Sequence, residues 1–232
     1  MMALFPGQRL VFDHVHKTGG LAISGALHRA LPRGTLSPHF NPNERPVPEG
    51  DIPKWRHIAG HFGFKFRHLV PHFGSACTAT VIRDPAAGVV STYTFWRYNI
   101  PRDYGDHVAR AHDLGLSDFI RYFSERPGSL DRQSHFLAGP PHGDPVAFAQ
   151  DALAPYAIVG VTDDLAGFLT RVLAVTASRK ASGAADLLAV GGRNASLQRV
   201  EPSADDLAYL AERQPYDRAL YAEALRRAGM QA

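Results

Sequence analysis

Three short apolar runs along the chain have the pattern of buried parallel strands. They are RLVFDHV at 9–15, CTATVIRD at 77–84 and YAIVGV at 156–161. The strands of a parallel sheet are covered on both faces, so they read as continuous apolar, β-branched runs rather than as an alternation of apolar and polar residues. We therefore predict three parallel strands in these segments.

Each of these runs is followed by a segment whose apolar residues recur with helical spacing. The segments are 20–31, 85–98 and 164–175. In the first, Ile23 and Leu27 fall on one face; the second begins with Asp84 as N-cap and Pro85 at the first helical position. Strands that alternate with helices predict an α/β fold, in which a central parallel sheet carries helices on both faces.

The remaining segments have the composition of loops or of terminal helices. Segment 37–53 is dense in Pro, Asn and Glu, and segment 177–194 is rich in Gly, Ala and Ser. We expect both to be loops, either lids and binding loops or disordered segments. Segment 203–229 predicts two short helices that meet near Pro215 and pack on the flank of the sheet. With 45% hydrophobic residues, the chain is expected to form one domain, 1–232.

The positive charge of the chain is carried almost entirely by arginine. There are 21 Arg and 4 Lys, the formal net charge is +3, and no basic block stands out. Guanidinium groups pair bidentately with phosphate and carboxylate, whereas binding along a nucleic-acid backbone needs a concentrated basic stripe. We expect discrete anion contacts and no nucleic-acid partner.

The cysteine content and the N-terminal residues bear on the cellular location. Cys77 is the only cysteine, which excludes an intrachain disulfide. The chain reaches Pro6 and Arg9 before any long apolar stretch, so we expect neither a signal peptide nor a membrane span. These features favour a cytoplasmic protein and leave its oligomeric state open.

Segment 14–24, HVHKTGGLAIS, has the outline of a phosphate-binding loop. A Walker loop has Gly immediately before its Lys and another Gly five residues earlier, but His16 and Val11 hold those positions. What remains is an apolar strand, Lys17, two glycines and a helix, so backbone N–H groups can converge on an anion at the helix N-terminus. The alternative is that the glycines only make a tight turn and Lys17 is solvated.

A second candidate anion contact follows the second predicted strand. Arg83 ends that strand, and Ser91 lies two helical turns past Asp84. A seven-residue offset returns to nearly the same face of a helix, so Arg83 and Ser91 could hold one anion together. Ligands of α/β sheets collect at the carboxyl ends of strands, which places this pair beside Lys17. The open alternatives are an ion pair of Arg83 with a carboxylate and a bond from Ser91 back to the Ala87 carbonyl.

Several segments, read together, resemble one known family. They are VFDHVHKTGG at 11–20, IRDPAAGVVSTYTFWRY at 82–98, RQSHFLAG at 132–139, AIVGVTDDLAGFLTRV at 157–172, RNAS at 193–196 and LYAEALRR at 220–227. This set is similar to the carbohydrate sulfotransferases of the heparan sulfate 2-O-sulfotransferase-like superfamily, bacterial members included. Those proteins use 3′-phosphoadenosine 5′-phosphosulfate (PAPS). The resemblance implies a P-loop-like α/β fold and sulfuryl transfer to a hydroxyl-bearing acceptor, with a saccharide expected.

The resemblance assigns roles to residues in two elements. In the loop 14–24, the 5′-phosphosulfate would be held by Lys17 and by the backbone of Thr18, Gly19, Gly20, Leu21 and Ala22. In the element 81–93, Arg83 and Ser91 would hold the 3′-phosphate. Arg193, in the Gly-rich segment, would close over the nucleotide.

The chain departs from the family pattern at four positions. His16 replaces a proline, Leu21 and Ala22 replace a Thr-Ser pair, and Gly88 replaces a second arginine. Each lost hydroxyl removes a charge-assisted hydrogen bond worth about 1.5–3 kcal/mol, unless backbone donors or Ser24 compensate. We therefore expect weaker phosphate binding than the family pattern gives.

Sulfuryl transfer needs a base for the acceptor hydroxyl and a cation on the leaving phosphate oxygen. Lys17 can supply the cation. The stretch RHIAGHFGF at 56–64 resembles the family's G-H-x-x-F stretch, which carries a catalytic histidine. The resemblance thus makes His61 the candidate base, with His16 as the second candidate, and imidazole suits proton transfer near neutral pH.

Pairs of histidines raise the question of a metal site. His14 and His16 would share one face of a strand, and His57 and His61 would share one face if their segment is helical. The sequence has no HExxH motif and no cysteine cluster, so we expect no metal.

The acceptor site is expected in the segments 37–53 and 94–112. The second contains aromatic residues that could stack on a sugar and arginines that could meet an acidic group, namely Trp96, Tyr98, Tyr104, Arg97, Arg102 and Arg110. The same aromatic residues could instead belong to the core.

Two other functions stay open from the sequence. A P-loop kinase or NTPase would use Asp84 as the acid and Thr18 as a magnesium ligand, although the missing glycines and Pro85 argue against it. A non-catalytic protein that binds an adenosine phosphate or a glycan would fit the residues Leu21 and Ala22. Magnesium dependence separates the first alternative from a sulfotransferase, and a lack of transfer separates the second.

Overall fold

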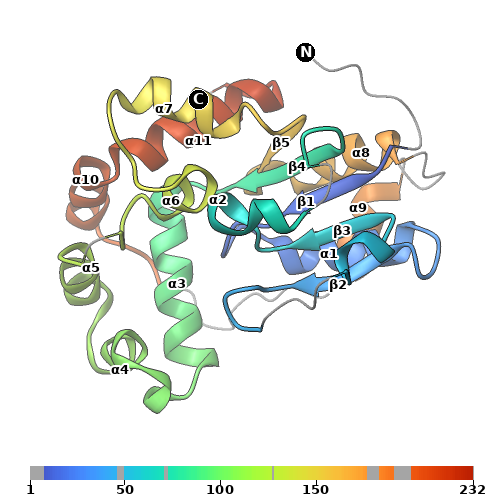
Figure 1. Ribbon diagram of the computed structural model, residues 1–232. Coiled ribbons are helices and arrows are strands. Elements are labelled where there is room, and N and C mark those ends of the chain that lie inside the picture. The colour runs from blue at the N-terminus through green and yellow to red at the C-terminus, as the bar shows by residue number, and fades with distance from the viewer. Residues whose placement is uncertain are drawn as a thin grey trace.

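The computed structural model describes residues 8–45, 50–70, 73–126, 128–176, 183–190 and 200–231. Its centre is a sheet of five parallel strands in the order β2-β3-β1-β4-β5 (Figure 1). The strands are β1 (Leu10–Asp13), β2 (Leu36–Phe40), β3 (His57–Gly60), β4 (Cys77–Ile82) and β5 (Ile158–Val161). Because β1 lies in the middle, later strands are added on both of its sides.

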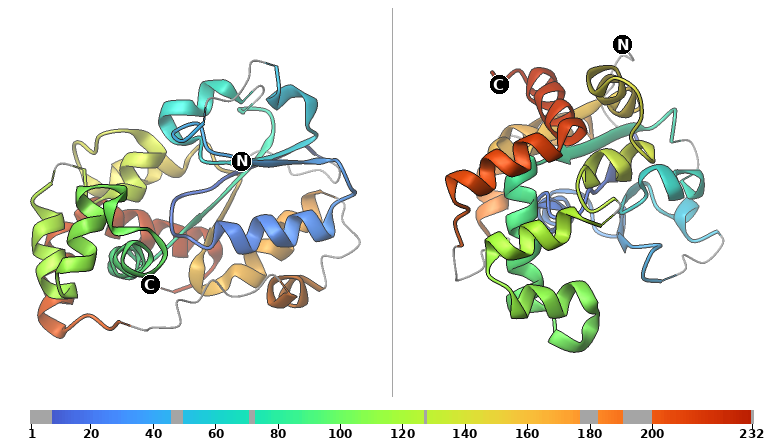
Figure 2. Two further views of the ribbon diagram at one scale, coloured as in Figure 1. Left: turned by 90° about the horizontal axis from the view of Figure 1, so that it is seen from below. Right: turned by 90° about the vertical axis from the view of Figure 1, so that its left-hand side faces the viewer.

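Helices cover both faces of this sheet, as the views in Figure 2 show. One face carries α1 (Gly20–Ala30), α8 (Leu165–Val175) and α9 (Ala184–Val190). The other carries α2 (Gly63–Phe66), α6 (Arg132–Ala138), α7 (Pro145–Leu153) and α11 (Pro215–Ala228). Buried strand residues alternate between the layers: Phe12 packs with the first set, and Val11 and Ile82 pack with the second. The three-layer α/β architecture expected from the sequence is confirmed.

Further helices lie beyond the carboxyl ends of the strands (Figure 1). They are α3 (Pro85–Asn99), α4 (Asp106–Asp113), α5 (Leu116–Ser124) and α10 (Ala204–Arg213), which we call the helical extension. Short 3-10 helices span Ile52–Lys54, Arg67–Leu69, Arg102–Tyr104 and Thr162–Asp164. The extension has a core of its own, in which Tyr93, Phe119 and Leu210 are buried. It therefore forms a wall beside the ends of the strands.

The predicted elements are confirmed, and others are added. Strands β1, β4 and β5 fall within the three apolar runs, helices α1, α3 and α8 follow them, and Pro215 begins α11 directly after α10. The prediction of a loop over 37–53 is wrong in part, because the strand Leu36–Phe40 reaches into it. This is an edge strand, which tolerates Pro38 because a neighbour pairs with only one side of it.

Two further predictions are corrected by the helices and strands near the site. Residues Ala184–Val190 of the Gly-rich segment form α9, while 177–182 and 191–194 lie outside the described residues. His57 lies in strand β3 rather than in a helix, and its Nδ1 accepts the N–H of Leu10 over 3.2 Å. His57 is thus a packing residue of the sheet.

Side-chain caps fix where the helices near the strand ends begin. The carboxylate of Asp84 accepts the N–H of Ala87 over 2.8 Å, with Pro85 as the first helical residue, as predicted. Asp164 caps α8 in the same way by accepting the N–H of Gly167 over 2.8 Å. None of the described helices combines the length and the apolar character that a membrane crossing requires.

Candidate functional site

The loops that follow β1, β3 and β4 meet at one edge of the sheet, which we call the carboxyl edge. β1 pairs with β3 on one side and with β4 on the other, all in parallel. The strands end at Asp13, Gly60 and Ile82, so the loop 14–19, His61 and Arg83 follow side by side. Crevices at such a point, where the chain direction across the sheet reverses, are where α/β sheets bind ligands.

The loop between β1 and α1 leaves backbone donors free at the start of a helix. Lys17 and Gly19 adopt positive φ angles of 65° and 79°. The Thr18 hydroxyl donates to the Val15 carbonyl over 2.8 Å and holds the turn. Among the described residues, the backbone N–H groups of Thr18, Gly19 and Leu21 meet no protein acceptor. Free N–H groups at a helix N-terminus favour an anion.

Two of the predicted backbone donors are engaged within the protein. The N–H of Gly20 donates to Nε2 of His14 over 3.1 Å, and a Cβ at Gly20 would lie 2.0 Å from that ring. The N–H of Ala22 donates to the Gly19 carbonyl over 3.0 Å. Glycine is therefore required at position 20 by the His14 ring, while the side chain of Leu21 is 62% exposed.

Lys17 and Arg83 lie together, as expected from the sequence. A terminal nitrogen of Arg83 donates to the Lys17 carbonyl over 3.1 Å, and Lys17 Nζ lies 3.8 Å from the ring centroid of Phe95. Burial, and then the charge of Arg83, lowers the pKa of Lys17 to about 8. Burial also lowers the pKa of Arg83, although the charges of Asp163 and Asp84 act in the opposite direction. Like charges are thus held together at this edge.

A third cation, Arg132 at the start of α6, joins them. In the part of the chain that the structure describes, Lys17, Arg83 and Arg132 each lack a carboxylate within ion-pair distance. The Arg132 guanidinium instead lies 5.8 Å from the Trp96 ring centroid and 5.6 Å from that of Phe123. Arg132 was not predicted as a site residue, because no local sequence pattern shows that a side chain lacks a partner.

A cavity of about 200 Å³ lies between α3, α6 and the loop after β1. It is lined by Val15, His16, Arg83, Pro85, Gly88, Val89, Thr92, Phe123, Gly128, Ser129, Arg132, Gln133, His135, Phe136, Gln214 and Asp217. Arg83 and Arg132 therefore share one cavity with His16. Ser91 is half-buried but does not line it, and no hydrogen bond joins Ser91 to Arg83 in the described chain. Arg193 lies outside the described residues.

His61 is the middle ring of a stack at the carboxyl edge. Its ring centroid lies 3.9 Å from that of His16 and 4.3 Å from that of His14. Its Nδ1 lies 2.5 Å from the backbone carbonyl of His14, which can only accept, so Nδ1 carries the proton and Nε2 has a free lone pair. Burial, followed by the charges of His16 and His39, lowers the pKa of His61 to about 3.

The turn that carries His61 is held by a buried carboxylate that no sequence motif indicates. Asp13 accepts the N–H groups of Phe62 and Gly63 over 3.0 Å each, and the Tyr156 hydroxyl over 2.6 Å. Burial raises the pKa of Asp13, and these hydrogen bonds oppose that rise. Asp13 thus fixes the backbone next to His61.

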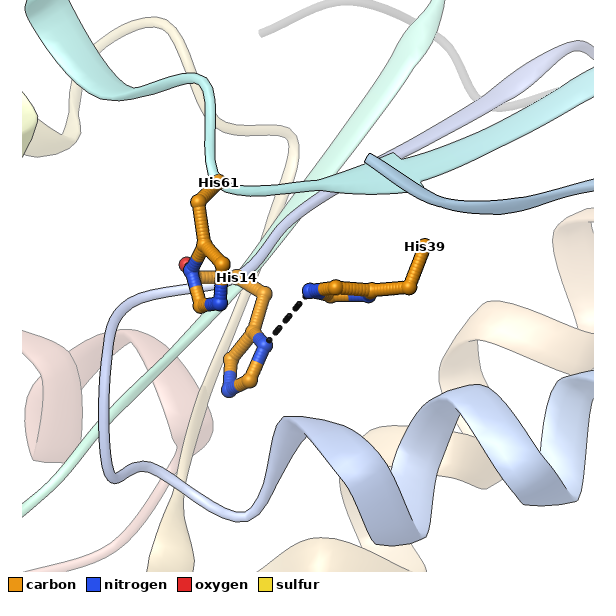
Figure 3. A group of neighbouring side chains, drawn as sticks. All are labelled: His14, His39 and His61. Carbon is orange, nitrogen blue, oxygen red and sulfur yellow. Dashed lines mark hydrogen bonds between the residues drawn. The ribbon is translucent and has the colours of Figure 1, made fainter. Parts of the chain in front are cut away.

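Two rings of this stack and a third histidine beside them converge and could hold a metal ion (Figure 3). Ring nitrogens of His14, His39 and His61 lie within 4.8 Å of one another. His14 Nε2 accepts the N–H of Gly20, so the proton of His14 sits on Nδ1, which faces His39 Nε2 over 3.3 Å. A metal ligand needs a lone pair on that nitrogen. In this hydrogen-bond arrangement His14 donates from Nδ1 to His39, so that nitrogen has no lone pair for a metal. A metal ion on His14 Nδ1 would require the proton to move to Nε2, which would break the hydrogen bond from Gly20.

The aromatic and basic stretch 94–112 builds the helical extension. The Trp96 ring stacks on His107, with centroids 5.8 Å apart, and Arg97 donates to three backbone carbonyls between Ala111 and Leu114. Arg102 makes a two-point contact with Asp113 over 2.8 and 2.9 Å. The expectation that these side chains meet an acceptor is therefore not supported, while Tyr104 remains 73% exposed.

The residues that a magnesium-dependent NTPase would need are already engaged. The Thr18 hydroxyl donates to a backbone carbonyl, and Asp84 caps α3. Comparisons with models of known families and with curated proteins return no match for this chain. The carboxyl edge, with its unpaired cations and free backbone donors, is therefore the candidate functional site.

Proposed function

We propose that this protein transfers the sulfuryl group of PAPS to a hydroxyl group of an acceptor. The observation that carries the proposal is that Lys17 and Arg83 meet at the carboxyl edge, next to the N–H groups of Thr18 and Gly19. Among the described residues, these two side chains have no carboxylate within ion-pair distance and the two N–H groups have no acceptor. A protein that holds like charges together gains stability when an anion lies between them. Two phosphate-sized contacts on adjacent strands suit a ligand with two anionic groups, as PAPS has.

In this proposal, Lys17 and the free backbone donors bind the 5′-phosphosulfate, and Arg83 binds the 3′-phosphate. Ser91 and Arg193 remain in the proposal through the resemblance alone. During transfer, an acceptor oxygen forms a bond to sulfur while the bond from sulfur to the 5′-phosphate oxygen breaks. The electron pair of that bond stays on the phosphate oxygen, where the charge of Lys17 stabilises it. The acceptor proton passes to a base.

His61 is the base in this scheme. Its Nε2 lone pair is free, because Nδ1 is bound to the His14 carbonyl. A pKa of about 3 makes the ring a weak proton acceptor in the free protein. A bound phosphosulfate would stabilise the imidazolium and raise that pKa toward the range a base needs. His16, which stacks on His61, is the second candidate.

A carbohydrate is the acceptor that the resemblance favours. The alternative function, non-catalytic binding of an adenosine phosphate, is supported by Leu21. Its exposed side chain occupies a position where the family has a hydroxyl group. A kinase or NTPase is less well supported, because Thr18 and Asp84 are engaged in hydrogen bonds within the protein.

Calorimetric titration with adenosine 3′,5′-bisphosphate, without magnesium, tests the proposed nucleotide site. We expect Lys17→Ala and Arg83→Ala each to lower the affinity about 10- to 100-fold, the range of one charge-assisted contact. Matched controls are Lys54→Ala and Arg126→Ala, because both side chains are exposed and paired with Asp51 and Asp106. ATP, with and without magnesium, and 5′-AMP serve as ligand controls.

The titration separates the possible outcomes. Binding that depends on Lys17, on Arg83 and on the 3′-phosphate supports a PAPS site. Preference for magnesium-ATP would favour the NTPase alternative. Lack of bisphosphate binding by the wild type would rule out the proposed PAPS site.

A further inference from the structure

The cavity beside Arg83 contains a cation whose donors meet no acceptor in the described chain. Arg132 makes no hydrogen bond or ion pair there, and its guanidinium lies near the faces of Trp96 and Phe123. Aromatic faces attract a cation but do not use its N–H groups as a carboxylate does. Arg132 is therefore ready to hold an anion.

The backbone that carries Arg132 is fixed by a buried hydrogen-bond lock. Asp217 of α11 accepts the N–H groups of Gln133 and Ser134 over 3.2 and 2.7 Å at the start of α6. Asp131, at a positive φ of 53°, accepts the N–H of Asp217 over 2.7 Å. A non-glycine residue at positive φ is costly and persists only where its surroundings hold it. The lock thus places Arg132 at a defined position.

The same helix is also clamped to the carboxyl edge. The side-chain amide of Gln133 accepts the N–H of Arg83 over 2.9 Å and donates to the Arg83 carbonyl over 2.8 Å. Arg132 and Arg83 therefore belong to one rigid unit, with both side chains lining the same cavity.

Acidic groups near Arg132 do not neutralise it. Asp217 lines the cavity and its charge acts on Arg132, but it lies beyond ion-pair distance and is already bound to backbone N–H groups. Burial is the main influence on the Arg132 guanidinium and lowers its pKa. A ligand that brings a negative charge into the cavity offsets the free-energy cost of burying the guanidinium charge.

The size and walls of the cavity restrict that ligand. Apolar side chains supply much of its lining, including Val89, Phe123 and Phe136. An apolar cavity of about 150 Å³ takes up a benzene ring, and this one measures about 200 Å³. The space suits a single ring with one short anionic arm.

The cavity reaches His16, the second candidate base, whereas His61 does not line it. His16 lines it, and the His16 ring lies 3.9 Å from that of His61, centroid to centroid. A ligand anchored on Arg132 therefore extends toward the histidine stack, where a hydroxyl would meet the base.

We propose that this cavity is the acceptor pocket and that it takes a small hydroxylated acid, an apolar ring with a carboxylate held by Arg132. The acceptor role rests on the proposed sulfuryl transfer, whereas binding of the acid does not. A monocyclic acid is a different class of acceptor from the saccharide that the resemblance favours.

The test measures binding of 4-hydroxyphenylacetate and of its neutral analogue 4-hydroxyphenylacetamide, by calorimetry, with and without adenosine 3′,5′-bisphosphate. The wild type is expected to bind the acid about 10-fold or more tightly than the amide, as a charge-assisted contact gives. Arg132→Gln removes this preference. Arg126→Gln, on the exposed side of the helical extension, retains it.

The acid and amide titrations test the Arg132 pocket, and the bisphosphate titration tests the proposed sulfuryl transfer. Equal binding of acid and amide by the wild type, or an unchanged preference in Arg132→Gln, overturns the Arg132 pocket even if the bisphosphate binds. Loss of bisphosphate binding with an intact acid preference removes the sulfuryl transfer and leaves the pocket. Circular dichroism checks the fold of each variant. If Arg132→Gln does not fold, Arg132→Lys takes its place, and the preference must fall but keep its sign.

Discussion

The arginines of the helical extension and the cations of the carboxyl edge differ in their partners. In the extension, Arg102 contacts Asp113, Arg126 contacts Asp106, and Arg97 donates to backbone carbonyls. At the carboxyl edge, Lys17 and Arg83 have no carboxylate within ion-pair distance in the described part of the chain. Charged side chains that are paired within the protein stabilise its structure. Charged side chains that are partly buried and have no protein partner indicate a ligand.

The largest effect is expected from the base. Replacing His61 by alanine should lower turnover by on the order of 10²–10⁴, the contribution of a general base, while leaving bisphosphate affinity nearly unchanged. The readouts are formation of the sulfated product and a calorimetric titration. His142→Ala is the matched control, because His142 is exposed and lies outside the site. Wild-type activity in the His61 variant would remove this residue from the mechanism.

A smaller effect is expected from pH. The pKa of Lys17 is about 8 in the free protein, because burial and Arg83 disfavour its charged form. Below pH 8 the ammonium is present and meets the anion. Above it the free protein has lost that proton, so binding must take one up and affinity falls, by about 10-fold per pH unit at most.

Titrations between pH 6.5 and 9.5 in buffers of different ionisation enthalpy measure this proton uptake. Lys17→Arg is the control variant, since its charge does not titrate in that range. If the wild type takes up no proton at pH 8.5, the titration is assigned to the wrong group.

The smallest effect is expected in the helical extension. Arg102→Gln breaks an exposed contact with Asp113, and exposed ion pairs contribute little to stability. Thermal denaturation should show a minor shift, and bisphosphate affinity should stay at the wild-type value. A large loss of nucleotide affinity in this variant would mean that the extension also holds the anion, and the contrast between the two regions would fail.

The sequence predicted the parts of the fold in which local pattern and burial agree. β1, β4 and β5 are continuous apolar runs, and α3 carries its cap signals in Asp84 and Pro85. β2 and β3 were not predicted, because they are short and contain polar residues such as Ser37 and His57 at buried positions. Such strands are defined by their pairing with distant residues, which the local sequence does not reveal.

Some residues of the candidate site were predicted from the sequence, but their hydrogen-bond partners were not. Lys17 and Arg83 could be placed at strand ends, and they do follow β1 and β4, whereas His61 was a candidate through the resemblance alone and follows β3, which was not predicted. The hydrogen bond from Gly20 to His14 and the free state of Arg132 depend on contacts between segments far apart in the chain. Only the folded structure shows which donors are engaged and which are free.

A crystal structure of the complex with adenosine 3′,5′-bisphosphate is the decisive test of the proposed nucleotide site. We expect the 5′-phosphate at the N-terminus of α1, in contact with Lys17 and the N–H groups of Thr18 and Gly19, and the 3′-phosphate on Arg83. A nucleotide bound elsewhere, with Arg83 turned onto Asp163 or Asp84 instead, would contradict this expectation.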